Sequence, residues 1–503
     1  MLSAVVHSLA PEDVNGVEVL QSDLAAEFPL YIYHPDDAEY LLYSRSIQLL
    51  LEDPRVKKPL ATSDEGVSFL LQSGVIPPPK TIYRDIYLLG IGDKAMVRSD
   101  GRKISLEFDH DFPFRNAERL SPEEMTPDGD QILQLVAEAT ISRVEPSRPT
   151  FLFHSAGKDS NTIALALAEA GWQNRVSLIT HKSTGEKDES EISAHIARKL
   201  GFSHCVLHEK VKPSIDEIKS VESYFTEAPL PSTDKVTLAY PFYSDQVPSL
   251  EGANLIDGMG NDAYIGHIPS AHEYEGQRRS SFLQKGRSVA KKFSSESIWF
   301  SATRSRAEWC GLGGFSLADS QAIFPRSCDV FPYWKSQDRY RDYLDLRAFV
   351  RGRVVDQEVF IRKVRNFSDV SSSNLVLPFT NPHVAEYFAK MPEQYLYDRR
   401  NLKNKLILRE LLKKRIGLDS DAIGKKGFSY DYSALMKENW DWFMDEIRSC
   451  RLWDKAGLEM VLPRLERAVM HGHRRAFMAE HLIYRLYLVS AWFNHNKYVI
   501  EGQ

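Results

Sequence analysis

Phe151-Leu-Phe-His-Ser-Ala-Gly-Lys-Asp-Ser160 stands almost directly before Thr162-Ile-Ala-Leu-Ala-Leu-Ala168. The pattern predicts an apolar strand that turns sharply through small residues into a helix. Such a turn directs several backbone N–H groups, a helix N-terminus and two hydroxyl groups to one place, which suits an anion and most simply a phosphate. An ordinary strand-to-helix turn built from small residues is the alternative.

A second loop of similar character follows about a hundred residues later. The apolar strand in Leu255-Ile-Asp-Gly-Met-Gly-Asn-Asp262 ends in Gly-x-Gly-x-Asp, where Gly258 and Gly260 let the backbone approach a ligand closely. Asp159 and Asp262 each follow an expected parallel strand, so their carboxylates could hold a Mg²⁺ ion that bridges phosphate oxygens. Gly-x-Gly-x-Asp alone is also a common turn, and its pairing with the first loop is what makes it informative.

Length and composition limit the classes of protein to consider. At 503 residues the chain is long enough for two or three domains. The 63 basic and 69 acidic residues give a net charge of −6, so we expect no nucleic-acid partner. We predict a cytoplasmic protein with no membrane span, because no basic segment precedes the short apolar N-terminal run and no stretch of about 18 apolar residues occurs. The dispersed cysteines fit reduced thiols rather than disulfides or a zinc site: Cys205, Cys310, Cys328 and Cys450.

The chain changes character near residue 130. Residues 1–120 carry short β-like segments and turn residues, and the acidic, proline-containing stretch 119–130 is a candidate linker. After it, strand and helix patterns alternate, which predicts an α/β domain with a parallel sheet and ligands at the carboxyl ends of the strands. We expect strands at 29–33, 40–43, 151–154, 176–180, 205–208 and 254–257, and helices at 132–141, 161–170 and 189–200. Beyond about residue 340 the sequence is mostly helical.

Five short motifs, in one order, give the chain a family resemblance. Ser155–Ser160 differs by one methyl group from Ser-Gly-Gly-x-Asp-Ser, the pyrophosphate loop of enzymes that split ATP into AMP and pyrophosphate. With the other motifs, the chain resembles the asparagine synthetase family, including its β-lactam synthetase and lasso-peptide cyclase branches. The resemblance implies a parallel-sheet ATP-pyrophosphatase (adenine nucleotide α-hydrolase-like) domain over 130–503 with a helical C-terminal part. The other matching segments are 188–204, 258–262 with Gly266, 377–384, and 405–410 with 425–428.

The first 120 residues resemble the last part of the family's glutaminase domain. The resemblance lies in 49–56, 74–83 and 88–95, and it implies a truncated, β-rich, glutaminase-like domain over 1–120. In glutamine-using members, a cysteine follows the initiator methionine and its thiol attacks glutamine. Here Leu2 occupies that position, so we predict a degenerate domain that does not hydrolyse glutamine by the family route.

The resemblance also implies a reaction. A substrate carboxylate attacks the α-phosphate of ATP, pyrophosphate leaves, and an amine then attacks the acyl adenylate to form an amide and AMP. The implied cofactors are ATP and Mg²⁺, with Asp159 and Asp262 as metal ligands. Lys425 and Lys426 are the implied catalytic residues, which would neutralise charge at the phosphate or at the tetrahedral intermediate. The implied nucleotide-binding residues are Ser155, Ala156, Gly157, Lys158, Asp159, Ser160, Gly258 and Gly260.

Each of the charged candidates also has a simpler interpretation. Asp159 could cap a helix, Asp262 could be an ordinary turn residue, and Lys158 could point to solvent. Lys425 and Lys426 could be a solvated pair in a loop.

Two other features could belong to the site or to the surface. The basic stretch 399–415, with Glu410 as its only acid, fits a solvated helix face, although Lys405 could neighbour the nucleotide. His181 follows the second strand of the α/β domain and could contact adenine or only close a turn.

Two positions depart from the family pattern where a general base is expected. The residue inside Gly-x-Gly is Glu in asparagine synthetases and Tyr in β-lactam synthetases, but here it is Met259, which accepts no proton. Asn374 stands at the position that often carries Glu before Pro-Phe. The general base is therefore unassigned, or the incoming amine arrives neutral.

Our leading hypothesis is a lasso-type macrolactam cyclase of peptide natural-product biosynthesis, because those relatives also keep a truncated or inactive glutaminase domain. A β-lactam or other small-molecule amide synthetase comes next. From a different class, the chain could be a catalytically inactive scaffold that binds nucleotide. Met259, Ala156 and the missing N-terminal cysteine favour this alternative, and the intact residues Asp159, Asp262 and Lys425 oppose it. The expected partners are ATP, a peptide or amino-acid derivative that supplies carboxylate and amine, and a precursor peptide or a maturation protease.

Overall fold

A sheet of five parallel strands organises the larger part of the chain, in the order β10-β9-β8-β11-β12. The computed structural model describes residues 5–36, 39–184, 188–266, 268–424, 430–471 and 476–499. Because all five strands run in one direction, their carboxyl ends share one edge of the sheet. The strands are β8 (Thr150–Phe153), β9 (Ser177–Lys182), β10 (Ser203–His208), β11 (Asn254–Ile256) and β12 (Asn374–Val376).

The four strands that the sequence predicts for this sheet are confirmed, each to within two residues at either end. The fifth strand, β12, was not expected, since three residues are too few to show a hydrophobic period. It exists because it pairs with β11, where Leu375 lies opposite Leu255. The mixed α/β class with a parallel sheet is therefore confirmed.

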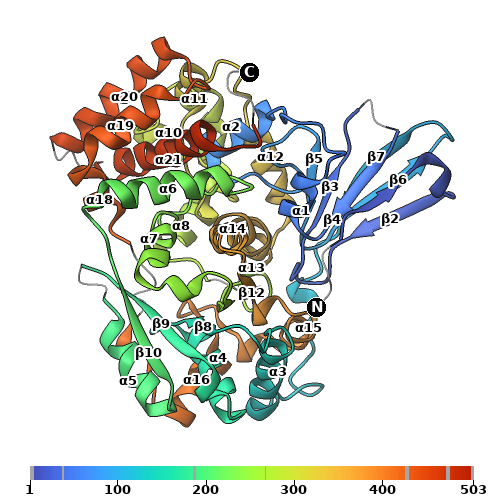
Figure 1. The fold of residues 1–503 in the computed structure, drawn as a ribbon, viewed down its shortest axis with the longest axis vertical. Coiled ribbons are helices and arrows are strands. Elements are labelled where there is room, and N and C mark those ends of the chain that lie inside the picture. Colours follow the sequence, from blue (N-terminus) through green and yellow to red (C-terminus); the bar gives the residue numbers. More distant parts are fainter. Residues whose placement is uncertain are drawn as a thin grey trace.

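Helices surround the sheet and also build a separate layer above it (Figure 1). Helix α4 contacts both α3 and α16 in the lower half of Figure 1. The lower helices are α3 (Gly129–Ile141), α4 (Lys158–Glu169), α5 (Ser190–Leu200) and α16 (Leu406–Ile416), and the first three confirm predicted helices. The upper half contains α6 (Ile215–Glu227), α7 (Ala239–Gln246), α19 (Trp440–Ser449), α20 (Lys455–Met470) and α21 (Ala476–His495).

A long helix runs through the interior between these two layers. It begins as a π-helix, η9 (Ala348–Ile361), and continues as α14 (Arg362–Val370). Gly352 lets η9 touch the loop that carries Asp262, because a Cβ at Gly352 would lie 2.3 Å from the backbone of Ala263. π-Helical segments are frequent at functional sites, and this one reaches the edge where the strands end.

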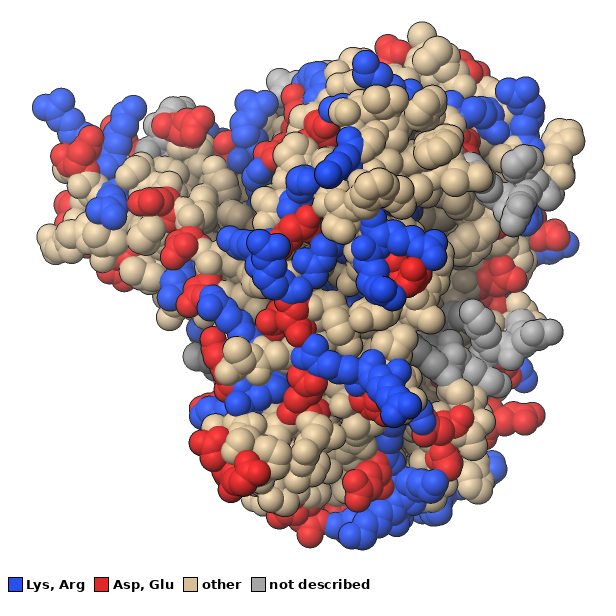
Figure 2. Space-filling view, turned by 180° about the vertical axis from the view of Figure 1, so that it is seen from behind, with Lys and Arg blue, Asp and Glu red and all other residues tan. Residues whose placement is uncertain are grey.

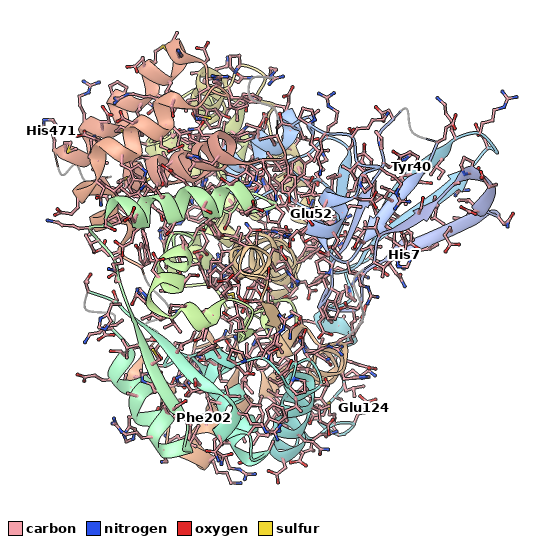
Figure 3. All side chains as sticks on the ribbon, in the orientation of Figure 1. His7, Tyr40, Glu52, Glu124, Phe202 and His471 are labelled. Atoms are coloured by element: carbon pink, nitrogen blue, oxygen red, sulfur yellow. The ribbon has the colours of Figure 1, made fainter. Side chains whose placement is uncertain are left out.

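The N-terminal residues form two antiparallel sheets, which confirms the predicted β-rich character. Apolar side chains from both sheets meet in a small core of their own, which includes Ile32, Leu41 and Val97. Figure 3 shows His7 and Tyr40 on this unit and Glu52 where the unit meets the rest of the molecule. One sheet has the order β1-β4-β3-β5, with β1 (His7–Leu9), β3 (Leu30–Tyr33), β4 (Leu41–Ser44) and β5 (Ile86–Leu89). The other has the order β2-β6-β7, with β2 (Val17–Gln21), β6 (Asp93–Ser99) and β7 (Ile104–His110), and helices α1 (Ile47–Glu52) and α2 (Asp64–Ser73) complete the unit.

A buried ion pair joins the N-terminal unit to η9. The carboxylate of Asp93 in β6 accepts a hydrogen bond from Arg353, and the two side chains are 3% and 2% exposed. Arg353 also donates to the carbonyl of Ile91. Nδ1 of His110 lies 2.9 Å from the same carboxylate oxygen, Oδ1 of Asp93. The position of the helix that reaches the sheet edge therefore depends on the N-terminal unit.

The predicted linker 119–130 begins with a firmly docked residue. Arg119 donates hydrogen bonds to the carbonyls of Phe388, Ala389 and Met391 and to Tyr397. A single buried cluster also contains side chains from both sides of this stretch. The domain boundary at 120–130 accordingly stays a prediction.

Both signs of charge are spread over the surface. Figure 2 shows the rear face, where basic side chains gather across the middle and acidic ones lie among and around them. In the described part of the chain, no helix combines the length and the apolar character that a membrane crossing requires.

We predict that Arg353→Ala lowers the free energy of unfolding by about 3–5 kcal/mol, because it leaves the Asp93 carboxylate buried without its partner. Urea denaturation at neutral pH measures the effect. The matched control is Arg98→Ala, since Arg98 lies 3.8 Å from Glu107 with 54% of its side chain exposed, and its loss should stay within about 0.5 kcal/mol. Equal losses in the two variants would contradict the anchoring role of the buried pair.

Candidate functional site

The loop after β8 opens helix α4 without a side-chain cap. Gly157 is the residue that precedes the first turn, and as a glycine it has no side chain that could accept a hydrogen bond from the N–H groups of that turn. Uncapped N–H groups at a helix N-terminus are donors for an anion. Asp159 is the second residue of the helix, so the interpretation of Asp159 as the helix cap is wrong.

Other N–H groups of the same loop are already bonded. Ser155 N donates to Oγ of Ser160 at 3.3 Å, and Gly157 N donates to Oγ of Ser155 at 3.0 Å. Ala156 N donates to the carboxylate of Glu189 at 2.9 Å. Sequence reasoning missed Glu189, because it lies on another segment, directly before α5. The N–H groups of Ser155, Ala156 and Gly157 thus have partners inside the protein, and their contact with a nucleotide stays a prediction.

The second loop packs against the first at Gly258. A Cβ at Gly258 would lie 3.0 Å from the backbone N of Ser160 and 3.1 Å from Cβ of Asp159, so this glycine lets the two loops approach each other. Gly260 has φ +104°, a Cβ on it would lie 2.3 Å from Cγ2 of Thr380, and its N–H donates to the carboxylate of Asp356 at 3.1 Å. The approach of these glycines to a ligand stays a prediction.

This approach brings Asp159 and Asp262 to the same buried cation, Lys405. Nζ of Lys405 lies 2.6 Å from Oδ2 of Asp159 and 3.8 Å from Oδ1 of Asp262, and it donates to Oδ1 of Asn261 at 2.7 Å. Burial favours the neutral amine, but Asp159 and Asp262 outweigh it and raise the pKa of Lys405. Lys405 is 6% exposed and has a left-handed backbone, with φ 57°.

Lys405 therefore belongs to the site and not to the surface. The prediction of a solvated basic face is correct for the end of α16, where Lys413, Lys414 and Arg415 are exposed. Lys405, which we expected could neighbour the nucleotide, stands just before that helix, and its side chain turns inward to the two carboxylates.

The two aspartates fit a Mg²⁺ ion that arrives with a nucleotide. Their carboxylates already share a cation, which shows that positive charge is favourable at this point. Among the residues that the structure describes, no three His, Cys, Asp or Glu side chains gather as a complete metal site. Mg²⁺ commonly uses one or two carboxylates and completes its shell with phosphate oxygens and water.

Two further buried carboxyl groups lie near the loops. Burial, joined by repulsion from Asp262, raises the pKa of Asp356 well above its usual range. Burial likewise raises the pKa of Asp257 to about 6, against the opposing effect of Lys363. Oδ1 of Asp257 accepts the backbone N–H of Met259 at 3.1 Å. Asp356 sits in an apolar run that shows only a helical pattern, so sequence reasoning missed it.

A cavity of about 180 Å³ opens beside the first loop, at the carboxyl ends of the strands. His181 lines it from within β9, and its Nδ1 lies 2.9 Å from the hydroxyl of Tyr243. The interpretation that His181 only closes a turn is therefore wrong, while contact with adenine stays a prediction. The remaining walls come from Phe153, His154, Ser155, Gly157, Asp159, Ser160, Ile179, Leu207, Tyr240, Asp257, Gly258 and Met259.

The remaining residues that the sequence analysis singled out do not lie at this site in the described structure. Lys425, Lys426 and Leu2 lie outside the described residues. Asn374 is the first residue of β12, so it lies at the amino end of the sheet, opposite the site, where its amide donates to Arg143 O and to Asn254. No base could act from that position.

Comparison with known proteins places the larger part of the chain in one family. Residues 131–493 match the family model described as asparagine synthase. A search of curated proteins gives no match.

The neutral imidazole of His154 supports the first loop through hydrogen-bonding contacts. Its Nε2 lies 3.1 Å from Oδ1 of Asn161, and the Asn161 amide in turn donates to the carbonyls of Ser155 and Gly157. Nδ1 contacts the hydroxyl of Ser193. Burial lowers the pKa of His154 to about 4.

We predict that His154 destabilises the fold as the pH falls from about 6.5 towards 4. As the pH falls, His154 takes up a proton near pH 6.5 in the unfolded chain but only near pH 4 in the folded protein. The free energy of unfolding is therefore highest above pH 6.5 and falls by about 3 kcal/mol by pH 4. Urea denaturation at pH 7 and pH 4.5 measures this loss. His154→Asn should show a smaller loss than the parent, while the exposed His471→Asn should match the parent. Identical pH dependence in all three proteins would contradict the prediction.

Proposed function

The chain belongs to the asparagine synthase family of ATP-dependent amide-forming ligases, and we propose that it activates a peptide carboxylate as an acyl adenylate and closes a macrolactam. The observation that carries the proposal is the pair Asp159 and Asp262 around Lys405, beside the uncapped start of α4. This arrangement offers cation sites and N–H donors where a polyphosphate must be held.

In the proposed reaction, a carboxylate oxygen attacks the α-phosphorus of ATP. The bond from that phosphorus to the oxygen of pyrophosphate breaks, and the acyl adenylate forms. An amine nitrogen then attacks the acyl carbon, the bond to AMP breaks, and the amine loses a proton. Asp159 and Asp262 would hold Mg²⁺, which supplies charge neutralisation for the phosphates when it is bound.

The chain's own residues have separate roles in this scheme. The first turn of α4 and the hydroxyl of Ser160 would bind the leaving pyrophosphate, and the cavity that His181 lines would take the adenine ring. Lys405 neutralises the two carboxylates and would donate to phosphate oxygens. Met259 accepts no proton, so the proton that the attacking amine nitrogen loses must pass to another group. Asp257 is a candidate on the same loop, where its Oδ1 accepts the backbone N–H of Met259.

Two arguments support a macrolactam cyclase among the possible amide-forming ligases: the family resemblance of the sequence and the character of the N-terminal unit. The resemblance of this unit to the end of a glutaminase domain, with Leu2 in place of the nucleophile, supports an amine that comes from the substrate rather than from glutamine. A precursor peptide and a maturation protease are the proposed partners, in the cytoplasm. A β-lactam or other small-molecule amide synthetase is the second candidate. A catalytically inactive scaffold that binds nucleotide is the third candidate, and formation of AMP would exclude it.

We predict that the protein converts ATP to AMP and pyrophosphate with a peptide that carries an acidic side chain and a free amino terminus. The peptide product should have lost one water. Asp159→Ala and Asp262→Ala should each lower turnover about a thousandfold, or ~4 kcal/mol of transition-state stabilisation. Asp216→Ala, at a side chain that is 90% exposed, is the control and should leave the rate unchanged. Formation of ADP instead of AMP, or near-normal rates in both site variants, would refute the assignment.

We predict that Lys425→Met lowers turnover much more than it lowers ATP affinity, whereas Lys426→Met is mild. In the resemblance, the catalytic lysine stands two residues before Gly427, and a cation beside developing charge stabilises the transition state more than the ground state. Pyrophosphate release and amide product are followed for each variant. If Lys426→Met lowers turnover strongly and Lys425→Met does not, the assignment of Lys425 as the catalytic lysine is wrong. If neither substitution lowers turnover strongly, this loop does not belong to the active site.

A further inference from the structure

A second cavity, of about 240 Å³, lies where the N-terminal unit meets η9. Strands β6 and β7 form one side of it through Lys94, Phe108 and His110. The other side comes from η9, from α12 (Phe331–Ser336) and from the short helix η8 (Gln337–Arg339). This cavity shares no lining residue with the one beside the pyrophosphate loop, so it is a separate space.

Aromatic rings and prolines form the apolar part of the lining. The rings belong to Phe108, Tyr333 and Phe349, and the prolines are Pro78 and Pro79. Pockets for drug-sized ligands have volumes of about 300–1,000 Å³ and combine apolar walls with a few convergent polar groups. A volume slightly below that range suits a small molecule with an apolar body.

The basic side chains of the lining exceed its carboxylates by one. Lys94, Arg339 and Arg353 line the cavity, together with Asp93 and Asp109. The buried pair of Asp93 and Arg353 is already closed, and Asp109 lies opposite Lys94 in the sheet. Arg339 is exposed at the rim and contacts aromatic rings rather than a carboxylate. A negatively charged group is therefore favoured beside Arg339.

The lining also contains two buried acceptor atoms without a hydrogen-bond partner among the described residues. One is Oε1 of Gln337, a residue that is only 4% exposed. The Nε2 group of Gln337 donates to the carbonyl of Tyr333 at 3.1 Å, so the amide oxygen is the end that stays unsatisfied. Native proteins leave few buried polar atoms unsatisfied, so Oε1 indicates a missing donor.

The other acceptor is Nε2 of His110. Burial favours protonated Asp93, but Arg353 and His110 outweigh it and lower the pKa of this carboxyl group. The ionised carboxylate has no proton to give, so Nδ1 of His110 donates to Asp93 at 2.9 Å. Burial lowers the pKa of His110, which keeps the ring neutral and leaves a lone pair on Nε2.

We propose that this cavity binds a free amino acid with an aromatic side chain. Its carboxylate would accept hydrogen bonds from Arg339, and its amine would donate to Oε1 of Gln337 and Nε2 of His110. Its ring would pack among the aromatic side chains of the walls. An inorganic anion could not supply the donors that the two acceptors lack, and a simple amine could not use the basic rim.

The test uses L-phenylalanine as the probe, with binding measured calorimetrically in the absence of ATP. We expect a Kd of about 1 mM or lower. Two matched compounds each lack one recognised group: 3-phenylpropionate lacks the amine and L-phenylalaninamide lacks the carboxylate. Each should bind about tenfold more weakly than phenylalanine. Phenylalanine should also raise the melting temperature, because it binds only the folded protein.

Two variants remove the proposed contacts one at a time. Arg339→Met removes the cation of the rim, and Gln337→Met removes the unsatisfied acceptor, and each should weaken phenylalanine binding about tenfold. The matched control is Arg341→Met, at an exposed arginine two residues away that does not line the cavity, and it should keep the parent's affinity. Arg353 is left unchanged because it anchors η9. The melting temperature of each variant without ligand separates lost binding from lost folding, and the exposed Arg339 keeps the test valid if Gln337→Met does not fold.

Several outcomes would overturn the proposal. No binding of phenylalanine would mean that the cavity holds water only, and equal affinity for the three compounds would remove the recognition of carboxylate and amine. Equal affinity in Arg339→Met and Arg341→Met would exclude this cavity as the site. Competition between phenylalanine and MgATP would place the amino acid in the proposed active site instead. Because the measurement needs neither ATP nor turnover, its result is independent of the proposed ligase function.

Discussion

Two ionised carboxylates that share one partly buried site repel each other unless a positive charge lies near both. In this protein, Asp159 and Asp262 come from different loops, and Lys405, far along the chain, supplies that charge. Removing one partner of such a buried group leaves an uncompensated charge, which typically costs 3–5 kcal/mol. The contact therefore fixes the position of α4 and of the second loop, and it stabilises the left-handed backbone at Lys405, which a lysine adopts only at a cost.

The π-helix η9 connects this site to the rest of the molecule through its contacts. Gly352 and Asp356 attach it to the loop of Asp262, and Arg353 attaches it to Asp93 in the N-terminal unit. The N-terminal unit thus has a structural purpose, because it anchors the helix that packs against the second loop. One element therefore contacts both this loop and the N-terminal unit.

The sequence was sufficient to predict the parallel sheet and the place of both aspartates, because apolar strands followed by Gly and Asp leave a local pattern. It was not sufficient for Lys405, whose role depends on the direction of one side chain within a basic stretch that is otherwise solvated. Glu189 and Asp356 were missed for the same reason, since each reaches the site from a separate segment and neither forms part of a local motif. The three-residue strand β12 depends on its pairing partner, and the position of Asn374 at its amino end could not be seen without that pairing.

The ammonium group of Lys405 also affects whether the protein needs a metal ion in order to fold. Many metal-dependent sites are collections of like charges that hold together only after the ion has bound, so the apo chain is unstable or unfolded. Here the chain carries its own counter-ion, because Lys405 compensates one of the two negative charges of Asp159 and Asp262. We therefore expect the protein to fold without magnesium, and under the proposed function the ion would enter with the nucleotide as part of the substrate rather than as part of the scaffold. Chelation would stop such an enzyme without unfolding it.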